Sequence, residues 1–89
     1  MENLQEWIIE LRDSEGIKVV EGKKDKKALN DLGIKNVITI NQPLYRIVEH
    51  ISTSYKECIL LVDLDKEGKK IYSYLKRNLE RHGVKAIIK

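Results

Sequence analysis

The sequence contains only one cysteine, two histidines and one proline. A single cysteine excludes an internal disulfide framework and is expected in a protein of the reducing cytoplasm. One cysteine and two distant histidines also exclude a structural zinc site of the zinc-finger type. No apolar run approaches the roughly 20 residues that a membrane-spanning helix needs. The acidic, amphipathic first residues do not form a secretory signal, so we expect a cytoplasmic protein with no membrane attachment.

The 89 residues have room for one domain, which we expect to span 1–89. The composition is 42% hydrophobic and 35% charged, which is typical of a soluble globular domain. Residues 1–15 hold five acids and one base, a net charge of −4, and the remaining residues hold 16 bases and nine acids, a net charge of +7. The basic body favours an anionic partner, with nucleic acid first.

Four short apolar runs alternate with segments of helical periodicity. The runs are rich in β-branched residues and nearly continuous, which is typical of parallel strands covered on both faces. We expect the strands at 17–21, 36–40, 58–63 and 84–88, and the helices at 2–14, 24–32, 43–53 and 66–82. This alternation predicts an α/β layered fold with right-handed crossovers.

Glycine and proline mark the predicted helix ends. Gly16, Gly33 and Gly83 each follow a helical stripe and precede an apolar run, where a helix often ends at a glycine with positive φ. Pro43 fits the first turn of the third predicted helix, because its missing N–H is not needed there.

Carboxylates follow two of the predicted strands. Glu21 comes directly after the first buried run, and Asp63 and Asp65 come at the end of the third, with Glu67 two residues further on. Ligands of open α/β sheets bind outside the carboxyl ends of the strands. Two carboxylates that converge repel each other unless a cation lies between them, and Mg²⁺ is bound by one or two carboxylates while it keeps several waters.

Glycines and lysines surround these acids. Glycine lets the backbone turn sharply and lets a phosphate approach closely, and lysine adds positive charge around a metal-bound phosphodiester. The candidate phosphate-binding or nucleic-acid-binding residues are Gly22, Lys23, Lys24, Lys66, Gly68 and Lys69.

Two motifs together resemble the Toprim domain. They read VVEGKKD over residues 19–25 and LVDLDKEG over residues 61–68. Toprim domains occur in bacterial-type primases, topoisomerases and ribosomal-RNA maturation nucleases, and the resemblance covers about residues 17–88. It implies a Rossmann-like Toprim fold, in which a four-stranded, mainly parallel sheet is flanked by helices, with an extra helix over residues 1–15.

The resemblance also implies roles for the acids. Glu21 matches the family's general acid or base, and Asp63 and Asp65 match its ligands for Mg²⁺ or Mn²⁺. The Asp-x-Asp-x-Glu-Gly form makes Glu67 a candidate third metal ligand. The nucleophilic-tyrosine domain of topoisomerases and the zinc-binding region of primases are absent, so the chain is most similar to small stand-alone Toprim proteins. The implied activity is nuclease-like or nucleotidyl-transfer chemistry on RNA or DNA.

Other interpretations of the same residues remain open. Asp65 could cap the following helix instead of binding a metal, and Glu67 is favourable in a first helical turn for its charge alone. The domain could also be a non-catalytic module that binds nucleic acid or a protein partner in a larger processing complex. A haloacid-dehalogenase-like phosphatase is disfavoured, because its Asp-x-Asp pair follows the first strand, whereas here the pair follows the third.

Overall fold

The computed structural model describes residues 3–89, which form four helices and four strands. In chain order the elements are α1 (Leu4–Asp13), β1 (Ile17–Val20), α2 (Lys23–Asp31), β2 (Val37–Thr39), α3 (Leu44–Ser54), β3 (Glu57–Leu61), α4 (Lys66–Arg81) and β4 (Lys85–Ile88). Every predicted element is present, and its ends either coincide with the prediction or differ from it by one or two residues. Residue 2, where the first helix was predicted to begin, lies outside the described residues. Within 3–89, no helix is both long enough and apolar enough to cross a membrane.

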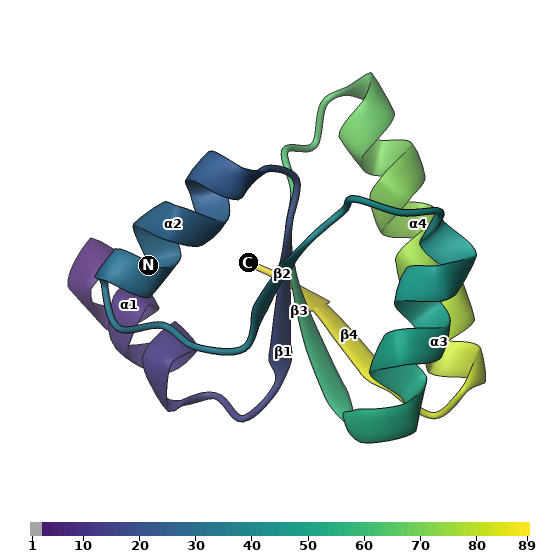
Figure 1. The fold of residues 1–89 in the computed structure, drawn as a ribbon, viewed down its shortest axis with the longest axis horizontal. Helices are drawn as coiled ribbons and strands as arrows, with labels where there is room; N and C mark the ends of the chain where they lie inside the picture. The colour runs from purple at the N-terminus through teal and green to yellow at the C-terminus, as the bar shows by residue number, and fades with distance from the viewer. Residues whose placement is uncertain (1–2) are drawn as a thin grey trace.

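The four strands form one sheet in the order β2-β1-β3-β4, and all three neighbouring pairs are parallel (Figure 1). The predicted α/β fold is therefore confirmed, and the sheet is wholly rather than mainly parallel. The inner strand β1 is buried along its whole length, which explains why its sequence is apolar at every position except Lys18 rather than alternating.

The direction of each crossover decides which face a helix covers. The chain moves from β1 to β2 in one direction along the sheet, and from β2 to β3 and from β3 to β4 in the other. Right-handed crossovers in opposite directions place their helices on opposite faces. Accordingly α2 lies on one face, together with α1, and α3 and α4 lie on the other (Figure 1).

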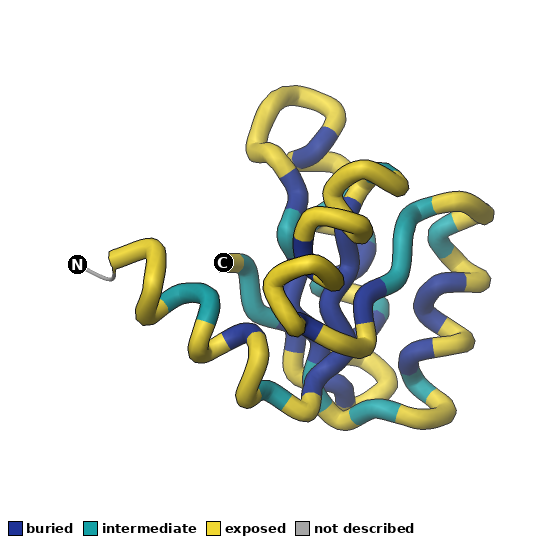
Figure 2. The backbone as a smooth tube through the Cα atoms, turned by 60° about the vertical axis from the view of Figure 1, so that its left-hand side comes forward, coloured by how far each residue is buried: buried dark blue, intermediate teal, exposed yellow. Residues whose placement is uncertain are grey.

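Each face of the sheet has its own apolar cluster. Alternate residues of β1 point to opposite sides, so Val19 packs in the cluster beneath α3 and α4, and Val20 in the cluster beneath α1 and α2. The cluster beneath α3 and α4 is the larger one. Figure 2 shows that α1 extends from the body with much of its surface exposed, and its one fully buried residue is Leu11.

Two of the three predicted glycine caps are confirmed. Gly33 has φ +82° and Gly83 has φ +78°, so both end their helices in the left-handed region. The prediction for Gly16 was wrong, because α1 already ends at Asp13 and Gly16 does not have a positive φ. Gly16 instead lies in a tightly packed position, since a Cβ there would lie 3.0 Å from the carbonyl oxygen of Glu57.

Lys18 is a polar exception inside the sheet. It is 1% exposed, and its Nζ donates to the carbonyl oxygen of Ser14 at 2.8 Å. Burial lowers the pKa of the Lys18 ammonium, and the nearby Glu57 carboxylate opposes that change. The sequence predicts this lysine within an apolar strand but indicates no partner for its ammonium group.

Candidate functional site

The sheet order places a topological switch point between β1 and β3. These two strands are neighbours, with Val20 opposite Leu61 at their carboxyl ends, yet the chain leaves them in opposite directions. Crevices at such a point are where open α/β sheets bind ligands. Both predicted acidic motifs begin here, because Glu21 follows β1 and Asp63 follows β3 by two residues.

Glu21 and Asp63 are in direct contact, although 42 positions separate them in the sequence. The backbone N–H of Asp63 donates to Oε1 of Glu21 at 2.9 Å. Both residues are exposed just beyond their strands, whereas the predicted strand ranges had included each of them as the last residue. The hydrogen bond connects the two motifs and leaves Oε2 of Glu21 without a hydrogen bond among the described residues.

Asp65 caps α4. Its Oδ1 accepts a hydrogen bond of 2.7 Å from the backbone N–H of Gly68, and its φ and ψ are those of an extended N-cap residue. The capping role left open by the sequence is therefore present, and Oδ2 has no hydrogen-bond partner within residues 3–89. Glu67 is exposed in the first turn of α4, where its charge is favourable at the helix N-terminus.

Gly68 is buried against the backbone that carries Asp63. A Cβ on Gly68 would lie 1.5 Å from the carbonyl oxygen of Asp63, so no larger residue fits without moving the loop. The backbone N–H of Gly68 already donates to the carboxylate of Asp65. Gly68 thus has a packing reason to be glycine, and its predicted contact with a phosphate stays a prediction.

The other candidate phosphate-binding residues lie at the starts of α2 and α4. Gly22 is the N-cap of α2 and supplies no side-chain acceptor to the first helical turn, where Lys23 and Lys24 are exposed. Lys66 and Lys69 are exposed at the start of α4. The two helix starts follow β1 and β3, so these lysines flank the contact between Glu21 and Asp63.

The donor set at this edge suits Mg²⁺ in chemistry but is not gathered into a metal-binding cluster. Asp63, Asp65 and Glu67 offer only carboxylate oxygens, the hard ligands that Mg²⁺ prefers. No hydrogen bond or ion pair among residues 3–89 uses the Asp63 carboxylate. In that same part of the chain, no three His, Cys, Asp or Glu residues are grouped so as to hold a metal ion. Binding would therefore require these exposed side chains to change rotamer.

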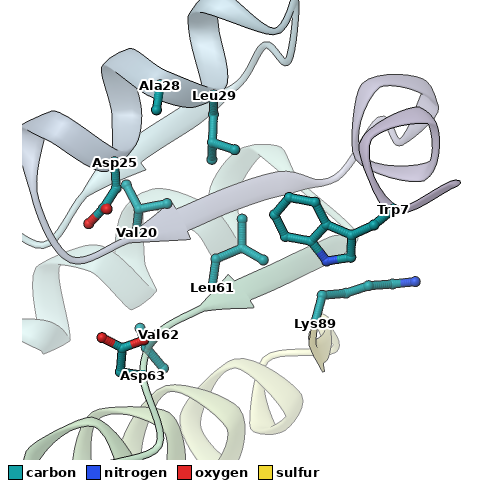
Figure 3. A pocket seen from close by; sticks show the side chains of 9 residues that line it. All are labelled: Trp7, Val20, Asp25, Ala28, Leu29, Leu61, Val62, Asp63 and Lys89. Atoms are coloured by element: carbon teal, nitrogen blue, oxygen red, sulfur yellow. The ribbon is translucent and has the colours of Figure 1, made fainter. Parts of the chain in front are cut away.

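A cavity of about 290 Å³ opens beside Asp63 on the face covered by α1 and α2. Figure 3 shows the carboxylates of Asp25 and Asp63 toward one end and the indole of Trp7 toward the other. Neither Trp7 nor Asp25 was predicted to be a site residue. Asp25 did lie within the first motif, which was a usable signal, whereas nothing in the sequence linked Trp7 to that motif. The cavity is lined by Trp7, Val20, Asp25, Ala28, Leu29, Leu61, Val62, Asp63 and Lys89.

Similar proteins occur in archaea and bacteria. The chain is 39% identical over 75 residues to a UPF0292 protein of Thermococcus kodakarensis, an alignment that covers 79% of this chain and 56% of that protein. It is 34% identical over 79 residues to a UPF0292 protein of Pyrococcus abyssi, covering 88% of this chain and 60% of that protein. The chain thus spans less than two thirds of the length of these curated relatives.

A solved structure of a protein from Aquifex aeolicus superimposes with a TM-score of 0.87 at 38% sequence identity, and the match covers 98% of this chain and 83% of that one. Residues 15–88 match the family model described as the Toprim domain, a span that contains all of the residues proposed from the two motifs. The chain belongs to the Toprim family.

Proposed function

We propose that this chain is a Mg²⁺-dependent Toprim domain that acts on nucleic-acid phosphodiesters in the cytoplasm, with a nuclease-like step favoured over nucleotidyl transfer. The observation that carries the proposal is the hydrogen bond from Asp63 N–H to Glu21 Oε1 at the switch point of the sheet. It joins a potential proton-transfer group to the backbone of Asp63, whose own carboxylate has no hydrogen-bond or ion-pair partner within residues 3–89. Membership of the Toprim family supports the same activity.

The aspartates would hold the metal ion. Asp63 has both carboxylate oxygens available, Asp65 has Oδ2, and Glu67 would assist from the first turn of α4. When bound, Mg²⁺ would draw negative charge from a phosphate oxygen and so favour attack on phosphorus. Oδ1 of Asp65 accepts the hydrogen bond from the Gly68 N–H. This bond fixes the orientation of the carboxylate, and so of Oδ2, the oxygen that would bind the metal ion.

Glu21 would transfer the proton. Its Oε1 is held by the Asp63 N–H, so Oε2 is the oxygen left to accept a proton from the attacking group or to return one to the departing oxygen. The hydrogen bond also restricts where that oxygen can lie. Lys23 and Lys24 on one side and Lys66 and Lys69 on the other would attract and hold the phosphate backbone.

End-labelled single-stranded RNA and DNA, incubated with and without Mg²⁺ or Mn²⁺, test the proposal. Wild-type protein should cleave or join at least one of them only with metal. Asp63→Asn and Glu21→Gln should each reduce the rate by about 10² or more, the scale of a general acid–base contribution. Glu21→Gln keeps an oxygen that can accept the Asp63 N–H, so it isolates proton transfer from structure. Equal rates in the wild type and both folded variants would remove the mechanism.

A non-catalytic module is the second candidate. The observation that favours it is that no three potential ligands among residues 3–89 are grouped for a metal ion. Such a module would bind nucleic acid or a protein partner in a larger processing complex. It predicts binding without turnover, no change in backbone NMR shifts at residues 21 and 63–67 during a Mg²⁺ titration, and a stable partner on co-purification. Affinity that falls steeply with salt would assign nucleic acid rather than protein as the ligand.

A further inference from the structure

The cavity beside Asp63 combines an apolar floor with two different ends. Val20 and Leu61 come from the ends of β1 and β3, and Leu29 comes from α2. The Trp7 indole lies toward one end, and the Asp25 and Asp63 carboxylates lie toward the other (Figure 3). Mostly apolar cavities of about 300 Å³ or more with a few convergent polar groups are typical of small-ligand sites.

We propose that this cavity receives an unpaired nucleobase of a single-stranded nucleic acid, an inference that rests on the proposed function. A base has two apolar π-faces and a polar edge. The faces suit the indole and the aliphatic floor, and the exocyclic amino groups of cytosine, adenine and guanine can donate to carboxylate oxygens. The Asp25 carboxylate, which takes no part in the proposed metal site, repels a phosphate, and the ammonium of Lys89, which also lines the cavity, pairs with Glu10. The base rather than the backbone therefore enters the cavity.

The cavity is continuous with the proposed catalytic edge. Asp63 lines the cavity and also contacts Glu21 through its backbone N–H. A nucleotide whose base occupied the cavity would therefore place its phosphate at the edge flanked by Lys23 and Lys24. A base can reach the cavity only when it is unstacked and unpaired, which selects single strands or loops over duplex.

The aromatic side of the cavity comes from outside the span that the Toprim model matches. Trp7 belongs to α1, which precedes the span 15–88 matched by the Toprim model. Trp7 is half-buried and packs against the cluster beneath α1 and α2, so its ring is held next to the cavity. The N-terminal helix would thus supply base binding, while the Toprim core supplies the phosphate and metal groups.

Trp7 is the one tryptophan of the sequence, so its fluorescence reports on the cavity directly. Single-stranded DNA oligomers are titrated in EDTA, without divalent metal, beside abasic oligomers of the same length. Base-bearing oligomers should quench the emission saturably and bind about tenfold or more tighter than abasic ones, the scale of base–aromatic stacking. Equal quenching and equal affinity for both would overturn the inference.

Two leucine substitutions on α2 provide a matched pair. Ala28 is exposed and lines the cavity, whereas Asn30 is exposed on the same helix and does not line it. Ala28→Leu should fill the entrance and weaken binding of a labelled oligomer about tenfold, and Asn30→Leu should bind like the wild type. Both variants should keep the wild-type circular dichroism spectrum. Equal weakening in both, or in neither, contradicts the assignment.

The indole itself is tested by two further variants that use the labelled oligomer. Trp7→Phe keeps an aromatic face and should retain most of the affinity, whereas Trp7→Leu should lose about as much as Ala28→Leu. If metal-dependent turnover is absent but base-dependent quenching persists, the proposed function fails and the base site stands. If turnover depends on Glu21 and Asp65 but Ala28→Leu binds like the wild type, the base site fails and the proposed function stands.

Discussion

Gly68 and the carbonyl oxygen of Asp63 are so close that a Cβ on the glycine would lie 1.5 Å from that oxygen. The first turn of α4 therefore packs directly on the loop that carries both aspartates. The loop is held from two further points, since Asp65 accepts from Gly68 N–H and Glu21 accepts from Asp63 N–H. Stability and site geometry are consequently coupled at this one position.

We expect Gly68→Ala to displace the loop and to reduce the free energy of unfolding by roughly 1–3 kcal/mol, because a methyl group must be forced into a filled space. The measurement is urea denaturation followed by circular dichroism. Gly22→Ala is the matched control: its added Cβ would meet only Asp25 Oδ2, at 3.7 Å, and its φ of −137° suits any residue. A destabilisation by Gly22→Ala as large as that by Gly68→Ala would contradict the packing explanation.

Substitutions of Asp65 separate its capping role from its proposed role as a metal ligand. Asp65→Ala removes the acceptor for Gly68 N–H and should cost about 1 kcal/mol of stability. Asp65→Asn keeps an acceptor oxygen and should stay within about 0.5 kcal/mol of the wild type, yet weaken Mg²⁺ binding as strongly as Asp65→Ala does. Thermal unfolding and an NMR titration with Mg²⁺ measure the two effects. If Asp65→Asn bound Mg²⁺ like the wild type, the charge of this residue would have no part in the metal site.

Lys18 should make stability rise with pH. Burial lowers the pKa of its ammonium in the folded state below the ordinary 10.5, so between these two values the unfolded chain binds more protons than the folded one. The unfolding free energy therefore increases through that window as pH rises, by at most about 1.4 kcal/mol per pH unit. Lys18→Met should lack this increase. Denaturation curves from neutral pH to pH 10.5 for both proteins provide the test, and parallel pH profiles over that range would show that the lysine is not the cause.

Cys58 should have the opposite effect at higher pH. The thiol is fully buried in β3, and burial followed by the charge of Glu57 raises its pKa from 9.0 to about 12. Between these values the unfolded chain loses the thiol proton while the folded chain keeps it, so the unfolding free energy falls as pH rises. Comparing Cys58→Ala with the wild type above pH 9 isolates this contribution. The variant should lose less stability per pH unit than the wild type; an equal or steeper loss would refute the assignment.

The local pattern of the chain was enough to predict the elements of the fold. The nearly continuous apolar run of β1 indicated a strand buried on both faces, and the strand is buried throughout, Lys18 included. Gly33 and Gly83 end their helices as predicted, because only the conformation of the local backbone matters there. Gly16 could not be interpreted in the same way, since the atom that crowds this position belongs to Glu57, in a strand distant in the sequence.

The sequence was sufficient to predict only some residues of the candidate site. The types and spacing of Glu21, Asp63 and Asp65 indicated a carboxylate site, because carboxyl ends of parallel strands share one edge. The double use of Asp65 as a cap was an open alternative that only the position of Gly68 N–H resolves. The place of Trp7 in the cavity could not be predicted, because helical periodicity indicates that this side chain packs on the sheet but not which residues it contacts.

The sequence by itself determined the strands, the helices and the chemical kind of the acidic edge, since these depend on periodicity, turn residues and side-chain type. Only the tertiary structure decided that β1 and β3 are neighbours, and hence that Glu21 reaches Asp63 and that a cavity opens between α1, α2 and the sheet. The physical reason is that strand order depends on how the helices pack on the two faces of the sheet and on the direction of each crossover. Neither property can be predicted from any one segment of the chain.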